Sequence, residues 1–125
     1  MSTLRRVLGI IAGVVFILSS GAHSFMGWPA LRQQLADVGA SAELQAGLQA
    51  GWQFGGAAML AFGVIVLTTF LGRSEPRPSR APASVIAVAY VLFGLWELIF
   101  TGNPFFLIFI IPGSLLAFAS MPTTR

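Results

Sequence analysis

Apolar residues along this chain occur in long runs that are separated by short polar segments. No Asp, Glu, Lys or Arg lies within 7–31 or 44–72, and Glu97 alone interrupts the run from 81 to 124. A helix needs about 20 predominantly apolar residues to cross about 30 Å of hydrocarbon. The first two runs therefore each predict one membrane span, whereas the third is about twice as long as a single span.

The third run contains a signal for chain reversal. Gly102 suits the C-terminus of a helix, Asn103 suits the N-cap of the next helix, and Pro104 suits its first turn. The pattern therefore predicts an all-α protein, a polytopic four-transmembrane-helix bundle that forms a single membrane domain over 1–125. The predicted spans cover about 5–27, 46–72, 83–101 and 104–121.

Two polar segments connect these spans. In 28–45, apolar positions recur at helical spacing while the charged residues fall on other faces. This pattern predicts a short amphipathic helix over 29–38 that lies on the outer face of the membrane or covers the end of the bundle. The segment 73–82 holds three prolines and three arginines, which predicts an extended loop.

Composition supports a membrane protein and excludes other classes. The chain is 56% hydrophobic and 9% charged, whereas soluble domains carry about 25% charged residues. The absence of cysteine excludes a disulfide scaffold and a thiol enzyme. No basic stripe alternates with aromatic residues, so we expect no nucleic-acid partner.

The distribution of arginine predicts how the spans are oriented. By the positive-inside rule, both termini and the 73–82 loop are cytoplasmic and 28–45 is external, as in a multi-pass protein of the bacterial inner membrane. Six arginines fall on the predicted inner side and one on the outer side: Arg5, Arg6, Arg73, Arg77, Arg80 and Arg125 against Arg32. Cleavage of a signal peptide after Ser20-Gly21-Ala22 is the alternative interpretation of the N-terminal run.

Ionisable groups within the predicted spans are the candidate functional residues, because burying a charge in lipid is costly. His23 and Glu97 both lie near the outer ends of their spans. We expect a hydrogen bond between them, directly or through one water, because it would lower the cost of burying either group. Further side chains complete the predicted outer polar pocket, as a ligand-binding or proton-carrying site: Gln49, Trp52, Gln53, Tyr90 and Asn103.

The sequence predicts no catalytic residues, no metal site and no cofactor. One histidine and no cysteine supply too few ligands for a metal, and no nucleophile–base pair or phosphate-binding glycine loop occurs. Two interpretations of the polar pocket stay open: a cluster that only fixes how the helices pack, and a site for a small molecule or a proton.

The N-terminal half of the chain resembles DoxX-like proteins, which are small four-helix proteins of the bacterial inner membrane. The similarity covers about the first 70 residues and rests on the arginines followed by an apolar helix ending in Gly21-Ala22-His23, the outer amphipathic segment, and the glycine-rich run Gly55–Gly63. Gln49 and Gln53 stand where an acidic residue would be expected in the second span. The resemblance implies a membrane accessory role near redox components.

These observations together predict a small integral membrane accessory or binding protein, and a non-enzymatic role is favoured. Its surroundings would be the lipid bilayer, its partners a larger membrane assembly or further copies of itself, and its ligand a lipid or quinone-like molecule. Two alternatives remain. One is a small proton-coupled transporter in which Glu97 carries the proton, and the other is a membrane enzyme that acts on a lipid or quinone.

Overall fold

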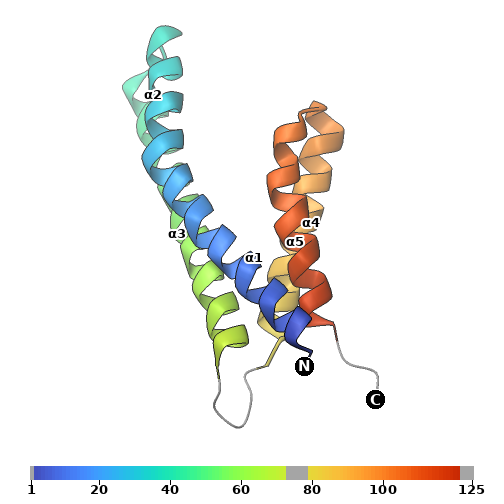
Figure 1. Cartoon of the computed structure of the whole chain (residues 1–125). Coiled ribbons are helices and arrows are strands. Elements are labelled where there is room, and N and C mark those ends of the chain that lie inside the picture. Colours follow the sequence, from blue (N-terminus) through green and yellow to red (C-terminus); the bar gives the residue numbers. More distant parts are fainter. Residues whose placement is uncertain (1, 73–78, 122–125) are drawn as a thin grey trace.

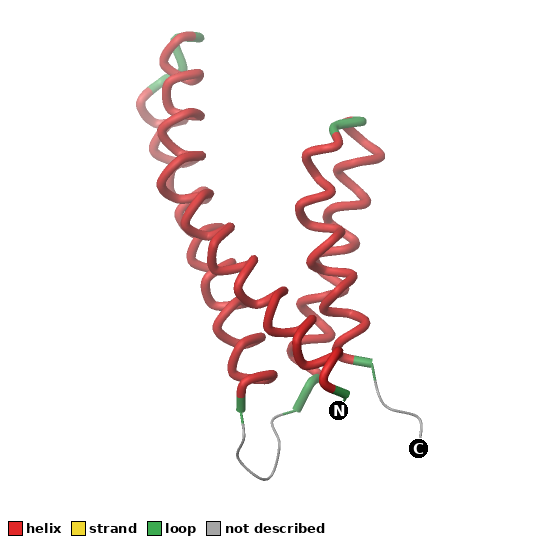
Figure 2. Tube along the Cα trace, in the orientation of Figure 1, coloured by secondary structure: helices red, strands yellow, loops and turns green. Residues whose placement is uncertain are grey.

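The computed structural model describes residues 2–72 and 79–121, and these residues are entirely helical apart from short connections (Figures 1 and 2). Most of the predicted 73–82 loop, with Arg73 and Arg77, and also Arg125 lie outside the described residues. In chain order the elements are α1 (Thr3–Ala22), the π-helical turn η1 (His23–Gly27), α2 (Trp28–Asp37), α3 (Ala42–Leu71), α4 (Ala81–Thr101), the 3-10 turn η2 (Pro104–Phe106) and α5 (Leu107–Ser120).

Three helical segments are long and apolar enough to cross a membrane, which makes the chain a membrane protein. They are Thr3–Asp37, Ala42–Leu71 and Ala81–Thr101, with 35, 30 and 21 residues. The fourth apolar segment, Pro104–Ser120, is shorter. The all-helical class predicted from the sequence is thus confirmed.

The helices form two hairpins, one of α1, η1 and α2 with α3, and one of α4 with α5 (Figure 1). Glycine allows the helices of the first hairpin to approach closely. A Cβ at Gly63 would lie 3.0 Å from the carbonyl oxygen of Gly13, and a Cβ at Gly13 would lie 2.8 Å from the side chain of Leu67. Small residues at such interfaces let dispersion contacts hold helices together in lipid, where burial from water does not.

The predicted outer helix is present, but it is not a separate element on the membrane face, and this part of the prediction is wrong. Trp28–Asp37 continues α1 through the π-helical turn as one 35-residue rod. Pro29 lies in the first turn of α2, where its missing N–H leaves the helical hydrogen-bond ladder incomplete. The wider π-helical turn accommodates this missing hydrogen bond. Helix α3 starts at Ala42 and pairs with the full length of the rod, so α2 stays in line with α1.

The second hairpin reverses where the sequence predicts. Gly102 ends α4 in the left-handed conformation, with φ of 66°, and the side chain of Asn103 accepts a hydrogen bond of 2.9 Å from the backbone N–H of Phe105. Further along, Gly94 and Gly113 bring α4 and α5 into close contact. Pro112 is buried inside α5 beside Gly113.

One end of the molecule, where α1 begins, is called the base. Here the Arg5 side chain donates a hydrogen bond of 2.8 Å to the carbonyl oxygen of Met121, and Arg6 donates one of 3.2 Å to that of Phe70. These arginines satisfy carbonyl groups that the ends of α5 and α3 leave free. The start of α1 and the ends of α3 and α5 are therefore held together at the base.

Halfway along the molecule, an aromatic layer takes one ring from each of the four long helices. Tyr90 of α4 packs against Phe16 of α1 with ring centroids 4.2 Å apart, and its ring lies 5.7 Å from Phe109 of α5 and 6.2 Å from Phe62 of α3. From the base to this layer the two hairpins pack on each other, and beyond it they diverge (Figures 1 and 2). The first hairpin also extends beyond the second.

Candidate functional site

Beyond the aromatic layer, His23 is paired with Trp52 across α1 and α3. Their rings stack with centroids 4.2 Å apart and planes 4° from parallel. The His23 Nε2 lies 3.0 Å from the carbonyl oxygen of Trp52, and the Trp52 indole N–H donates a hydrogen bond of 2.8 Å to the carbonyl oxygen of His23. Each side chain thus binds the backbone of the other.

This pair forms where α1 passes into the π-helical turn η1. The carbonyl oxygen of His23 accepts the backbone N–H of Trp28, five residues on, and also the indole N–H of Trp52. A Cβ at Gly27 would lie 2.7 Å from the Trp52 ring, so glycine makes room for the indole against α1. Single π-helical turns of this kind are frequent at functional sites.

Glu97 lies on the second hairpin, seven residues beyond Tyr90 and on the same face of α4. His23 is likewise seven residues beyond Phe16 on α1. Phe16 and Tyr90 are in contact, so these two faces meet at the aromatic layer, below the point where the hairpins diverge (Figure 1). Both residues lie about 10 Å beyond the aromatic layer, at about 1.5 Å per residue.

The direct His23–Glu97 hydrogen bond that the sequence predicts is not formed, and this part of the expectation is wrong; a contact through one water stays a prediction. Among the described residues, the Glu97 side chain has no hydrogen-bond or ion-pair partner, and the hydrogen bond of the His23 ring goes to Trp52. The physical reason is the divergence of the hairpins beyond the aromatic layer. Trp52 belongs to the adjacent helix of the same hairpin and is closer to His23.

The other predicted site residues are dispersed. Gln49 and Gln53 are exposed on α3, and Asn103 caps the 3-10 turn between α4 and α5. Tyr90 is buried in the aromatic layer, and its hydroxyl has no hydrogen-bond partner among the described residues. Of the predicted pocket, the structure therefore brings together His23 and Trp52, whereas Glu97 lies on the other hairpin.

A glycine on α3 makes room for the His23 ring, a feature that the sequence interpretation missed. Gly55 lies seven residues before Phe62, at the level of His23 and Glu97, and a Cβ there would lie 3.3 Å from the His23 Nε2. A Cβ at Gly51 would have no atom within 4 Å. The glycine-rich run was visible in the sequence, but its glycines alone do not reveal which helix they face.

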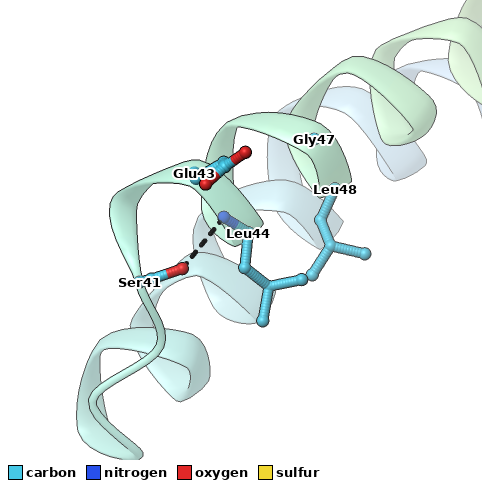
Figure 3. A pocket seen from close by; sticks show the side chains of 5 residues that line it. All are labelled: Ser41, Glu43, Leu44, Gly47 and Leu48. Carbon is cyan, nitrogen blue, oxygen red and sulfur yellow. Dashed lines mark hydrogen bonds between the residues drawn. The ribbon is translucent and has the colours of Figure 1, made fainter.

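A separate shallow depression lies at the tip of the first hairpin (Figure 3). Its lining comes from the first turns of α3: Ser41, Glu43, Leu44, Gly47 and Leu48. The Ser41 hydroxyl there accepts the backbone N–H of Leu44 at 3.2 Å, as an N-cap. With one exposed carboxylate and no facing element, this depression brings no groups together for chemistry.

Comparisons with models of known protein families, with curated proteins and with solved structures found no match to this chain. The resemblance to DoxX-like proteins therefore stays a prediction. The geometry around His23, Trp52 and Glu97 is what bears on function.

Proposed function

We propose that the chain is a four-span protein of the bacterial inner membrane with both termini and the 73–82 loop in the cytoplasm. Two observations support this topology. The hydrogen bonds of Arg5 and Arg6 to carbonyl groups at the ends of α5 and α3 return each hairpin to the base. In the sequence, arginine is concentrated at the start of α1 and after the ends of α3 and α5, and such residues are retained on the cytoplasmic side.

The fourth segment is long enough for this topology. Pro104–Ser120 is about 25 Å long at about 1.5 Å per residue, close to the thickness of the hydrocarbon. The rod Thr3–Asp37 is about 52 Å long by the same measure. With the base at the inner surface, the first hairpin would extend past the outer surface of the bilayer.

Within this topology, the protein acts as a non-enzymatic binding or accessory protein. The proposed site comprises polar groups in the outer halves of the two hairpins, Glu97 on α4 and the His23–Trp52 pair on the first hairpin. One observation carries the proposal: Glu97 is a half-buried carboxyl group in a membrane span and has no partner among the described residues. Such a group is costly in a membrane, so a bound molecule, a protein partner or a further copy of the chain would supply its partner.

A proton-coupled transporter with Glu97 as the proton carrier is less well supported. Transport requires polar groups that lead from Glu97 to the base. The aromatic layer lies between Glu97 and the base. Between this layer and the base, the buried side chains among the described residues are nearly all apolar.

An accessible site is tested by cysteine labelling, which the absence of native cysteine makes specific. Ala58 is half-buried one turn beyond Phe62, whereas Ala57 is exposed at the same depth on another face of α3. After native lipids are removed in dodecyl maltoside, we expect a polar methanethiosulfonate to modify Ala58→Cys much faster than Ala57→Cys, because the reaction needs a hydrated thiolate. Equal rates, or no reaction at either position, would contradict the proposal.

Native mass spectrometry of the same protein, before lipids are removed, identifies what occupies the site. We expect a retained lipid, a protein partner or a second copy that is lost in Glu97→Leu and kept in the control Glu43→Gln. Glu43 is an exposed acid in the first turn of α3, at the tip of the hairpin. A bare monomer in every preparation would argue against binding.

A further inference from the structure

We infer that the base of the molecule binds an anionic phospholipid, whose phosphate accepts hydrogen bonds from Arg5 and Arg6. The base lies on the other side of the aromatic layer from Glu97, so this surface is separate from the proposed site. The argument starts from how the two guanidinium groups are held. The Arg5 Nη1 donates to the carbonyl oxygen of Met121 at 2.8 Å, and the Arg6 Nε donates to that of Phe70 at 3.2 Å.

These two bonds use only part of the donors that the arginines carry. A guanidinium group presents several N–H donors in one plane, in a geometry that matches a pair of phosphate oxygens. No other described residue accepts a hydrogen bond from either side chain. Both side chains are half-buried and keep part of their surface exposed, where a further acceptor can bind.

The contacts within the chain also hold the guanidinium groups in place. Arg5 lies over the ring of Phe118, 5.3 Å from its centroid, in addition to its bond to Met121. Arg6 is held by the end of α3. Side chains that are already ordered lose less conformational entropy when a ligand binds.

Positive charge at the base exceeds the acid that could balance it. In the sequence, the segments 1–6, 72–80 and 121–125 together hold six arginines and one acid, Glu75. The carboxylates of the described residues lie elsewhere: Asp37 ends α2, Glu43 lies in the first turn of α3, and Glu97 lies near the far end of α4. The complementary partner is therefore an anion from outside the chain.

The surroundings of the arginines favour a lipid phosphate over a free anion. Phe118, whose ring lies under the Arg5 guanidinium, is itself exposed, and so are Met121 and Leu71 at the ends of α5 and α3. A phospholipid matches this combination, with its phosphate on the guanidinium groups and an acyl chain along Phe118. That the lipid belongs to the inner leaflet rests on the proposed topology, whereas its binding does not.

The first test is thermal unfolding of the full chain in dodecyl maltoside with added lipid. We expect dioleoyl phosphatidylglycerol to raise the unfolding midpoint, because a ligand of the folded chain stabilises it. Phosphatidylcholine with the same acyl chains has a phosphate but no net charge and should have much less effect. The double variant Arg5→Gln/Arg6→Gln should need about tenfold more phosphatidylglycerol for the same rise, because charge-assisted hydrogen bonds are lost.

The matched control is Arg32→Gln, which removes an exposed arginine from α2 on the outer part of the first hairpin. It should respond to phosphatidylglycerol as the parent does. A second measurement places each protein in nanodiscs of equal parts phosphatidylglycerol and phosphatidylcholine, and native mass spectrometry identifies the retained lipid. We expect phosphatidylglycerol on the parent and on Arg32→Gln, and its loss from the double variant.

Three outcomes would overturn the inference: equal effects of the two lipids on the parent, equal losses in the double variant and in Arg32→Gln, and stabilisation by sodium phosphate, at constant ionic strength, that matches that by phosphatidylglycerol. The last result would identify a site for free phosphate. If the double variant does not fold, Arg5→Lys/Arg6→Lys keeps both charges and should keep the preference for phosphatidylglycerol. None of these measurements involves Glu97 or the orientation of the spans, so failure here leaves the proposed function standing.

Discussion

The side chains of His23 and Trp52 each bind the backbone of the other residue. Both rings are only half-buried, yet the pair combines a parallel stack with two hydrogen bonds. In an apolar environment an unpaired N–H costs more than the net gain from one hydrogen bond in water. The pair therefore fixes how α1 and α3 align along their length beyond the aromatic layer.

We predict that Trp52→Phe lowers the stability of the protein in detergent. Phenylalanine can keep the stack on His23 but has no N–H for the His23 carbonyl oxygen, so we expect a loss of about 1–2 kcal/mol. Thermal unfolding measures the loss. The matched control is Trp96→Phe, since Trp96 is exposed and stacks on Phe100 of the same helix. Equal losses in both variants would contradict a specific role for the indole N–H.

A second prediction concerns the Tyr90 hydroxyl, which is buried without a hydrogen-bond partner among the described residues. Tyr90→Phe keeps the ring contacts of the aromatic layer and removes a polar group whose burial costs about 1–3 kcal/mol. We expect the variant to be as stable as the parent or more stable in thermal unfolding. A clear destabilisation would show that a bound molecule pairs with the hydroxyl.

At the scale of elements, the first hairpin depends on glycines that face the partner helix. A Cβ at Gly63 would lie 3.1 Å from the backbone nitrogen of Ile17, as well as close to Gly13. A larger side chain must push α1 and α3 apart, because the backbone cannot yield as a flexible side chain can. The glycine at position 51, by contrast, has open space where its Cβ would be.

These two positions make a matched pair. We predict that Gly63→Leu destabilises the protein by about 1–3 kcal/mol or more through overpacking. Gly51→Ala should be neutral or stabilising by up to about 1 kcal/mol, because alanine favours helix over glycine. Unfolding followed by circular dichroism compares them, and a similar loss at both positions would mean that helix propensity, not close approach, governs this hairpin.

At the scale of the whole molecule, the two hairpins meet between the base and the aromatic layer and diverge beyond it (Figure 1). Arg5 also lies over the ring of Phe118, 5.3 Å from its centroid, so the base is held by charge as well as by packing. The two hairpins are therefore in contact toward the base and apart toward the other end.

The predicted orientation has a direct test. Reporters fused after Arg125 and inserted near Pro78 should be cytoplasmic, and a reporter inserted near Gly39 should be external, because the arginines remain on the inner side. Paired alkaline phosphatase and fluorescent-protein fusions measure both sides. Reporters at Pro78 and Gly39 on the same side would exclude four spans.

Helical structure, membrane-spanning length and the sharp reversal at Gly102 and Asn103 could all be predicted from the amino-acid sequence. These features depend on local physics: the length of apolar runs relative to the bilayer, the tolerance of glycine for positive φ, and the capping preference of asparagine. The level of His23 and Glu97 could also be predicted, because rise along a helix is regular.

The pairing of His23 depended on the tertiary structure. Helical spacing places His23 and Glu97 on facing stripes, but it does not determine the angle between two hairpins. That angle depends on how Phe16, Tyr90 and their aromatic neighbours fill the space at the middle of the molecule. The hairpins diverge beyond these rings, so His23 pairs with Trp52 on the adjacent helix, and Glu97 has no partner among the described residues.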